Sequence, residues 1–179
     1  MILSIFFISM AILAYEICLM RIFAITQWHH FAYMIISIAL LGCGASGTLL
    51  SLGRSWFKKN FLCYYRLFSG LFPVTILLSY VLSQQIRFNP FEIVWNPRQI
   101  YALVAYYLIL FVPFFVAALC LGLVLSYYPE QIGWSYGANL LGSGCGVLGI
   151  VVCLSTWHPV LVLYLDQRCR LARNESGLV

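Results

Sequence analysis

The stretch IYALVAYYLILFVPFFVAALCLGLVLS, residues 100–126, contains no charged side chain. A bilayer core about 30 Å thick is crossed by roughly 20 residues at the 1.5 Å rise of an α-helix. Residues 100–126 are therefore long enough and apolar enough to cross a membrane as one helix.

Four more runs of similar length and composition flank this stretch. A strand of a membrane barrel alternates apolar and polar residues over about ten positions, whereas these runs are apolar on every face. We therefore predict an all-α, multi-pass bundle of about five transmembrane helices within residues 1–165, followed by a polar tail at 166–179. The expected spans are residues 1–20, 31–52, 67–86, 100–126 and 136–154.

The composition of the whole chain supports the same environment. Of its 179 residues, 63% are apolar and 8% charged, and the mean hydropathy is +0.95. Soluble domains carry about a quarter charged residues, so this chain has too little polar surface to face water. The same figures exclude a disordered chain, a nucleic-acid-binding protein and a disulfide-stapled secreted module. The lipid bilayer is the expected partner.

Basic residues indicate how the chain lies across the membrane. Four of them fall in the loop at 53–66, and Lys and Arg near span ends stay on the cytoplasmic side. We therefore expect this loop and the N-terminus to be cytoplasmic, in the inner (plasma) membrane of the cell. Five crossings would place the tail, which is also basic, outside. The basic residues of the loop are Arg54, Lys58, Lys59 and Arg66.

Two glycine patterns match G-x-G-x-x-G, at residues 42–47 and 144–149. A dinucleotide loop follows a strand and opens a helix, whereas these glycines lie within apolar runs long enough to cross a bilayer as helices. Small residues at four-residue spacing instead let helices pack closely in lipid, so we predict that the second and fifth spans form the internal seam. The predicted packing residues are Ala39, Gly42, Cys43, Gly47, Ala138, Gly142 and Gly146.

Glu16 is the one carboxylate inside an apolar run. Carboxylates within the membrane are energetically unfavourable and usually face the bundle interior or a water-filled cavity. Two alternatives stay open: Glu16 binds a proton or a cation, or it only fixes helix packing through a hydrogen bond. Arg21 lies five residues later, about 140° around the helix, and is expected to anchor the end of the span.

Two further polar residues complete the candidate intramembrane site. His30 belongs to a turn between the first two spans, and no third ligand is spaced to make a metal site. Asn139 lies in the fifth span, where its amide can bond to another helix or meet headgroup water. No catalytic set of side chains and no phosphate loop is found, so we expect neither a cofactor nor an autonomous enzyme.

Several motifs resemble one known family. The segments YEICLMRIF (15–23), WHHFA (28–32) and SIALLGCGASG (37–47) resemble the membrane region of spermidine synthase-like fused proteins, as do PFF (113–115) and YGANLLGSG (136–144). In that family, helices similar to those of major-facilitator transporters precede a soluble aminopropyltransferase-like domain. The resemblance extends over about residues 11–155.

This resemblance implies a membrane module without the chemistry of the synthase. The catalytic domain has no counterpart in this sequence, so no synthase activity is carried over, and Asn139 stands where many relatives have an acidic residue. The two spans that carry small residues are the second and the fifth. These are equivalent positions in the two three-helix units of an inverted-repeat transporter, so the chain is similar to a six-helix half of such a transporter that lacks its last span. We expect a transporter-like or substrate-channelling module. The alternative is a non-transporting anchor or assembly subunit for a soluble synthase-like protein or for further membrane helices.

Overall fold

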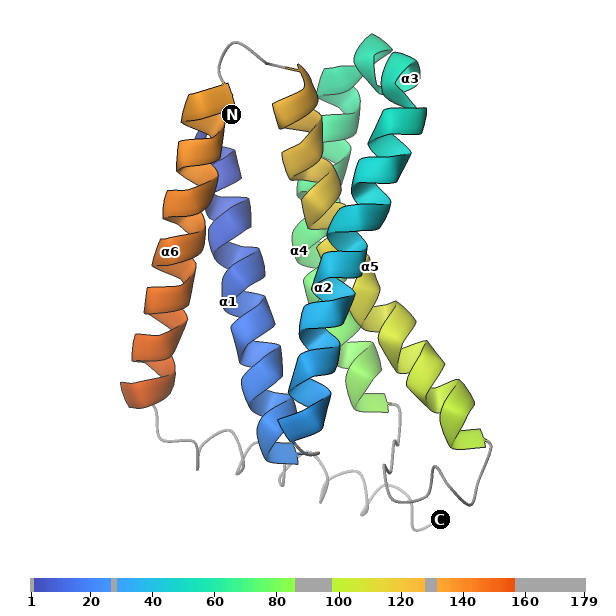
Figure 1. The fold of residues 1–179 in the computed structure, drawn as a ribbon, viewed down its shortest axis with the longest axis vertical. Helices are drawn as coiled ribbons and strands as arrows, with labels where there is room; N and C mark the ends of the chain where they lie inside the picture. Colours follow the sequence, from blue (N-terminus) through green and yellow to red (C-terminus); the bar gives the residue numbers. More distant parts are fainter. Residues whose placement is uncertain (1, 27–28, 86–97, 128–131, 157–179) are drawn as a thin grey trace.

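The computed structural model describes residues 2–26, 29–85, 98–127 and 132–156, and this part of the chain is helical apart from the turns at Gly53 and Asn60 (Figure 1). Five of its helices are long and apolar enough to cross a membrane. The predicted all-α bundle with about five spans is therefore confirmed. The helices are α1 (Ile2–Thr26), α2 (His29–Leu52), α3 (Arg54–Lys59), α4 (Phe61–Gln85), α5 (Arg98–Tyr127) and α6 (Ile132–Thr156).

The five long helices run up and down through one bundle (Figure 1). Helix α5 packs against both α2 and α4, and α1 packs against α2 on one side and α6 on the other. Of the five spans, α5 is the most buried and α6 the least. The N-terminus, α3 and the start of α6 lie at one end of the bundle (Figure 1).

The region expected to be a loop at 53–66 is largely helical. After a turn at Gly53, whose N–H donates to the carbonyl of Leu49 at 2.9 Å, α3 begins at Arg54. Helix α4 begins at Phe61 and not at Leu67. The charge of Arg66 does not interrupt α4 because its side chain is exposed at the end of the bundle, where a long basic side chain reaches water.

Helix α5 forms the centre of the bundle. Leu110 and Cys120 are fully buried, and Pro113 between them is also buried. Proline lacks an N–H and its ring displaces the preceding turn, which bends a helix. Figure 1 shows α5 changing direction along its length, with its first half diverging from the other helices.

Glycines of α6 set its distance from α1. A Cβ atom added to Gly142 would overlap the backbone carbonyl of Phe6, and one added to Gly146 would overlap that of Met10. With Ser135 and Ala138, these glycines form the buried face of α6. Close backbone contact over small residues is the usual way in which helices associate in lipid. The small residues predicted to pack in the fifth span therefore lie at its contact with α1.

The small residues of α2 pack elsewhere. A Cβ on Gly42 would lie 3.0 Å from the Cβ of Phe114 in α5. Of the stripe expected at Ala39, Cys43 and Gly47, only Ala39 is buried, because the face toward α5 continues through Gly42 and Ser46. The two small-residue stripes face different helices, α1 and α5, and so do not form one seam between the second and fifth spans.

Alanine at Gly142 should weaken the α1–α6 pair, because its Cβ would push against a backbone carbonyl that cannot rotate away. We expect Gly142→Ala to lower the free energy of unfolding by about 1–3 kcal/mol, the usual effect of overpacking. The measurement is SDS-induced unfolding of the purified protein in mixed micelles.

Gly144→Ala is the matched control, since it adds the same methyl group to the same helix with nothing within 4 Å of it. Equal stability of the two variants would contradict the close approach of α6 to α1.

Candidate functional site: an intramembrane carboxylate

Glu16 lies on the inward-facing stripe of α1. The buried residues Ile12 and Leu19 lie four positions before it and three positions after it. Such spacing puts the three side chains on one face of a helix. Glu16 therefore faces the neighbouring helices, and its side chain is half-buried.

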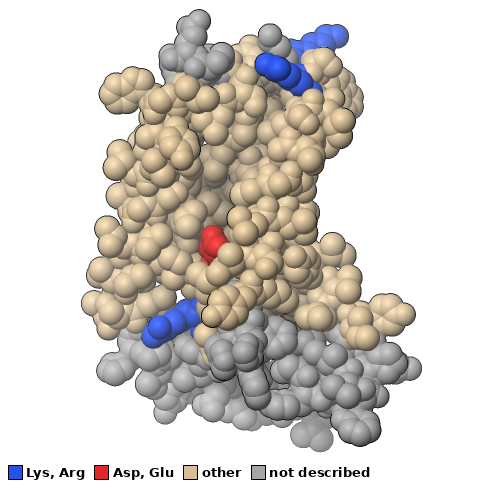
Figure 2. All heavy atoms as spheres, viewed as in Figure 1, with Lys and Arg blue, Asp and Glu red and all other residues tan. Residues whose placement is uncertain are grey.

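Among the described residues this carboxylate has no fixed counter-charge. Figure 2 shows it in red, in a hollow of the tan surface at mid-height of the bundle, and it is the only Asp or Glu in the described part of the chain. Within that part no residue forms an ion pair or a hydrogen bond with it. Arg21 is exposed near the end of α1, as the five-residue separation predicts.

Tyr15, the residue that precedes Glu16 in α1, forms a hydroxyl pair with Ser79 of α4. The hydroxyl oxygens of Tyr15 and Ser79 are 2.7 Å apart, which connects α1 to α4. The Ser79 hydroxyl donates its one hydrogen to the carbonyl of Ile76 at 2.9 Å, so Tyr15 is the donor to Ser79. Thr75 and Ser83 are also buried, one helical turn to either side of Ser79.

Asn139 forms a bond between helices. The hydroxyl of Ser9 in α1 donates to its Oδ1 at 2.6 Å, and Ser9 is fully buried. The structure thus selects the inter-helix alternative for Asn139 over contact with headgroup water. This bond lies on the same α1–α6 face as the glycines, so Asn139 belongs to helix packing and is separate from the surroundings of Glu16.

The three candidate residues whose side chains are described therefore do not form one site. Glu16, Arg21 and Asn139 occupy three different positions, and His30 lies in the first turn of α2 with its side chain outside the described residues. Sequence reasoning missed Tyr15 and the hydroxyls of α4. The available signal was Thr75, Ser79 and Ser83 at four-residue spacing, which places three hydroxyls on one face of an apolar span.

Together these features define a multi-pass helical membrane protein. Its outer surface is apolar: Leu40, Leu77 and Leu148 are each about two-thirds exposed, and soluble monomers rarely expose large continuous apolar surfaces. No group of three metal-ligating side chains occurs in the described residues. Comparison of the chain with protein-family models, curated proteins and solved structures gave no match.

The bond between Ser9 and Asn139 should contribute measurably to stability. We expect a double-mutant cycle of Ser9→Ala and Asn139→Ala to give a coupling energy of about 0.6 kcal/mol, and at most about 1.7, as for other inter-helix bonds in membranes. Unfolding in mixed micelles measures it.

Ser37→Ala combined with Asn139→Ala is the control cycle. Among the described residues Ser37 bonds within its own helix, to the carbonyl of Tyr33, so its coupling to Asn139 should be zero. A coupling energy of zero between Ser9 and Asn139 would show that their bond does not stabilise the folded bundle.

Proposed function

We propose that this protein is a transporter-like membrane module in which the carboxylate of Glu16 binds a proton or a small organic cation. The observation that carries the proposal is an inward-facing, half-buried glutamate in a membrane span, with no counter-charge among the described residues. Ionisable residues at such positions commonly mark ion and substrate pathways.

The neighbouring groups support this chemistry. Glu16 lies in a hollow of the bundle and not against lipid alone (Figure 2), so an ion has room to approach. The hydroxyl pair of Tyr15 and Ser79 adds polar groups to the bundle at the residue that precedes Glu16 in α1. The resemblance to the membrane region of spermidine synthase-like proteins suggests a polyamine as the cation.

Neutralising Glu16 should remove transport. We expect proteoliposomes that contain Glu16→Gln to take up labelled polyamine, under an imposed pH gradient, no faster than liposomes without protein. The amide keeps the shape of the side chain but binds neither a proton nor a cation. Glu16→Asp keeps the charge and should retain part of the uptake.

Glu175→Gln is the matched control, because it makes the same change in the polar tail. Its uptake should equal that of the unaltered protein. Uptake by Glu16→Gln at the same level would leave Glu16 with a packing role only.

We also propose that the end of the bundle carrying α3 faces the cytoplasm. The N-terminus and α3 lie at the same end (Figure 1), and α3 with the start of α4 contains the most basic segment of the chain. Basic segments of this kind remain on the cytoplasmic side. Because five helices cross the membrane, the tail that follows α6 would lie on the other side.

Thiol labelling tests this orientation. In a variant whose only cysteine is Cys63, which is exposed just after the start of α4, we expect a membrane-impermeant maleimide to react only after the cells are permeabilised. A variant with only Cys169, in the tail, should react in intact cells. The reverse pattern would invert the topology, and labelling of both from one side would contradict five crossings.

The alternative function is a non-transporting anchor or assembly subunit. The observation in its favour is α6, which packs mainly against α1 and is the least buried of the five spans. Its free side could accept further membrane helices or hold a complex with a soluble synthase-like protein. If the unaltered protein shows no uptake of protons or polyamines, this alternative is favoured.

A further inference from the structure

A partly open cavity of about 140 Å³ lies at the end of the bundle that carries α3. Its walls come from four helices: Leu50 of α2, Phe57 of α3, Phe61 of α4 and Leu123 of α5. Arg54 and Ser126 add a guanidinium and a hydroxyl to this apolar lining. The cavity is separate from Glu16 and plays no part in the proposed transport.

The fold builds this cavity through a tight corner between α2 and α3. The amides of Trp56 and Phe57 both donate to the carbonyl of Gly53 at 3.0 Å, which turns α3 back across the end of the bundle. On the other side, the rings of Phe61 and Tyr127 stack at 4.1 Å between centroids. The wall is therefore made of ordered helical residues and stacked rings.

The charge around the cavity is positive. Arg54 lines it, and Lys59 and Arg66 are exposed on α3 and the adjoining turn of α4. Figure 2 shows basic side chains gathered at this end, with no Asp or Glu beside them among the described residues. Glu130, in the connection that follows α5, lies outside those residues.

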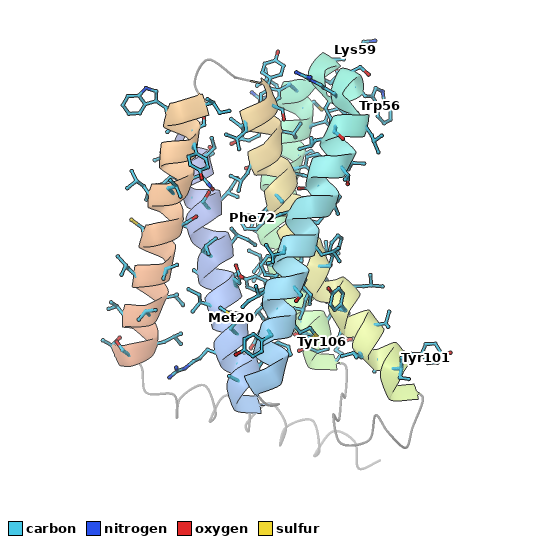
Figure 3. The ribbon with its side chains drawn as sticks, viewed as in Figure 1. Met20, Trp56, Lys59, Phe72, Tyr101 and Tyr106 are labelled. Atoms are coloured by element: carbon cyan, nitrogen blue, oxygen red, sulfur yellow. The ribbon has the colours of Figure 1, made fainter. Side chains whose placement is uncertain are left out.

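The position of the cavity matches the headgroup region of a bilayer. Trp56 is 71% exposed on α3 and Trp134 is 77% exposed at the start of α6, and Figure 3 shows Trp56 and Lys59 projecting at this end of the bundle. Tryptophan and basic residues concentrate at the depth of lipid headgroups. A ligand that combines an anionic group with an apolar chain would meet both parts of the lining at this depth.

We propose that this cavity binds one anionic phospholipid of the adjoining leaflet. Its phosphate pairs with the Arg54 guanidinium, whose planar donors suit two phosphate oxygens, and the Ser126 hydroxyl also lines the cavity. An apolar cavity of ~150 Å³ holds a molecule the size of benzene, so the cavity accepts only the acyl segment next to the headgroup, against Leu123 and the aromatic rings. The rest of the chain stays in the bilayer.

Native mass spectrometry of the detergent-purified full chain tests this site, with phosphatidylglycerol and phosphatidylcholine of identical acyl chains as probes. We expect one phosphatidylglycerol to be retained in preference to phosphatidylcholine. Arg54→Gln should weaken its binding about fivefold, the effect of removing one basic residue near an anionic lipid. Ser126→Trp, which fills the cavity from its rim, should weaken it through the acyl segment.

Arg21→Gln is the matched control, because it removes an exposed arginine near the opposite end of α1, and it should bind phosphatidylglycerol as the unaltered protein does. Equal retention of the two lipids, or unchanged binding by Arg54→Gln, would overturn the proposal. Unchanged binding by Ser126→Trp would overturn the placement of the acyl segment. Displacement of the lipid by millimolar glycerol 3-phosphate would indicate a site for free phosphate compounds instead.

Discussion

The absence of water from the bilayer core is the constraint on which this structure depends. Backbone N–H and C=O groups have no partner there except one another, so each span must be a helix. Lipid chains solvate leucine as well as another helix does, so apolar side chains alone do not hold the helices together. What remains is close contact and polar bonding, and the pair α1–α6 uses both, at Gly142, Gly146 and the bond from Ser9 to Asn139.

Helix α1 has two faces that pack against different helices. One side carries the backbone of Phe6 and Met10 toward the glycines of α6. The other continues the buried stripe of Ile12 toward α2 and α5, and Glu16 falls on this stripe. The glycine contact therefore has a consequence for the carboxylate, because it holds α1 in the rotation that points Glu16 into the bundle.

The spans were predictable because a charge-free run such as residues 100–126 has only one low-energy state in lipid. Which face of a span is buried was predictable only in part: the small-residue stripe indicated it for α6, but a helix that is apolar all round carries little further periodic signal. The face of α2 shows this: Ala39 is buried as expected, but Cys43 is exposed and Gly42 takes its place against Phe114. Choosing the face requires knowing the partner helix.

The candidate site was predictable to a similar degree. Glu16 stood out because a lone carboxylate in an apolar run needs an explanation. The bond partners of Tyr15 and Asn139 did not stand out, because each lies far away in the sequence, at Ser79 and Ser9. The basic segment was recognised by its charge. Its helix α3 was missed, since six residues are too few to show a helical period.

The basic side chains of the bundle lie toward its ends, away from the Glu16 carboxylate. The exposed basic residues Arg54, Lys59 and Arg66 lie at the α3 end, and Arg21 lies near the end of α1 that faces away from it. Among the described residues none of them pairs with the carboxylate, and an unpaired charge in lipid is energetically unfavourable, so Glu16 is expected to be protonated or paired with a cation there. A proton and an organic cation would each neutralise it, and one carboxylate holds only one of them at a time. In the proposed transport function, binding of either would therefore release the other, which is the condition for exchanging protons against cations across a membrane.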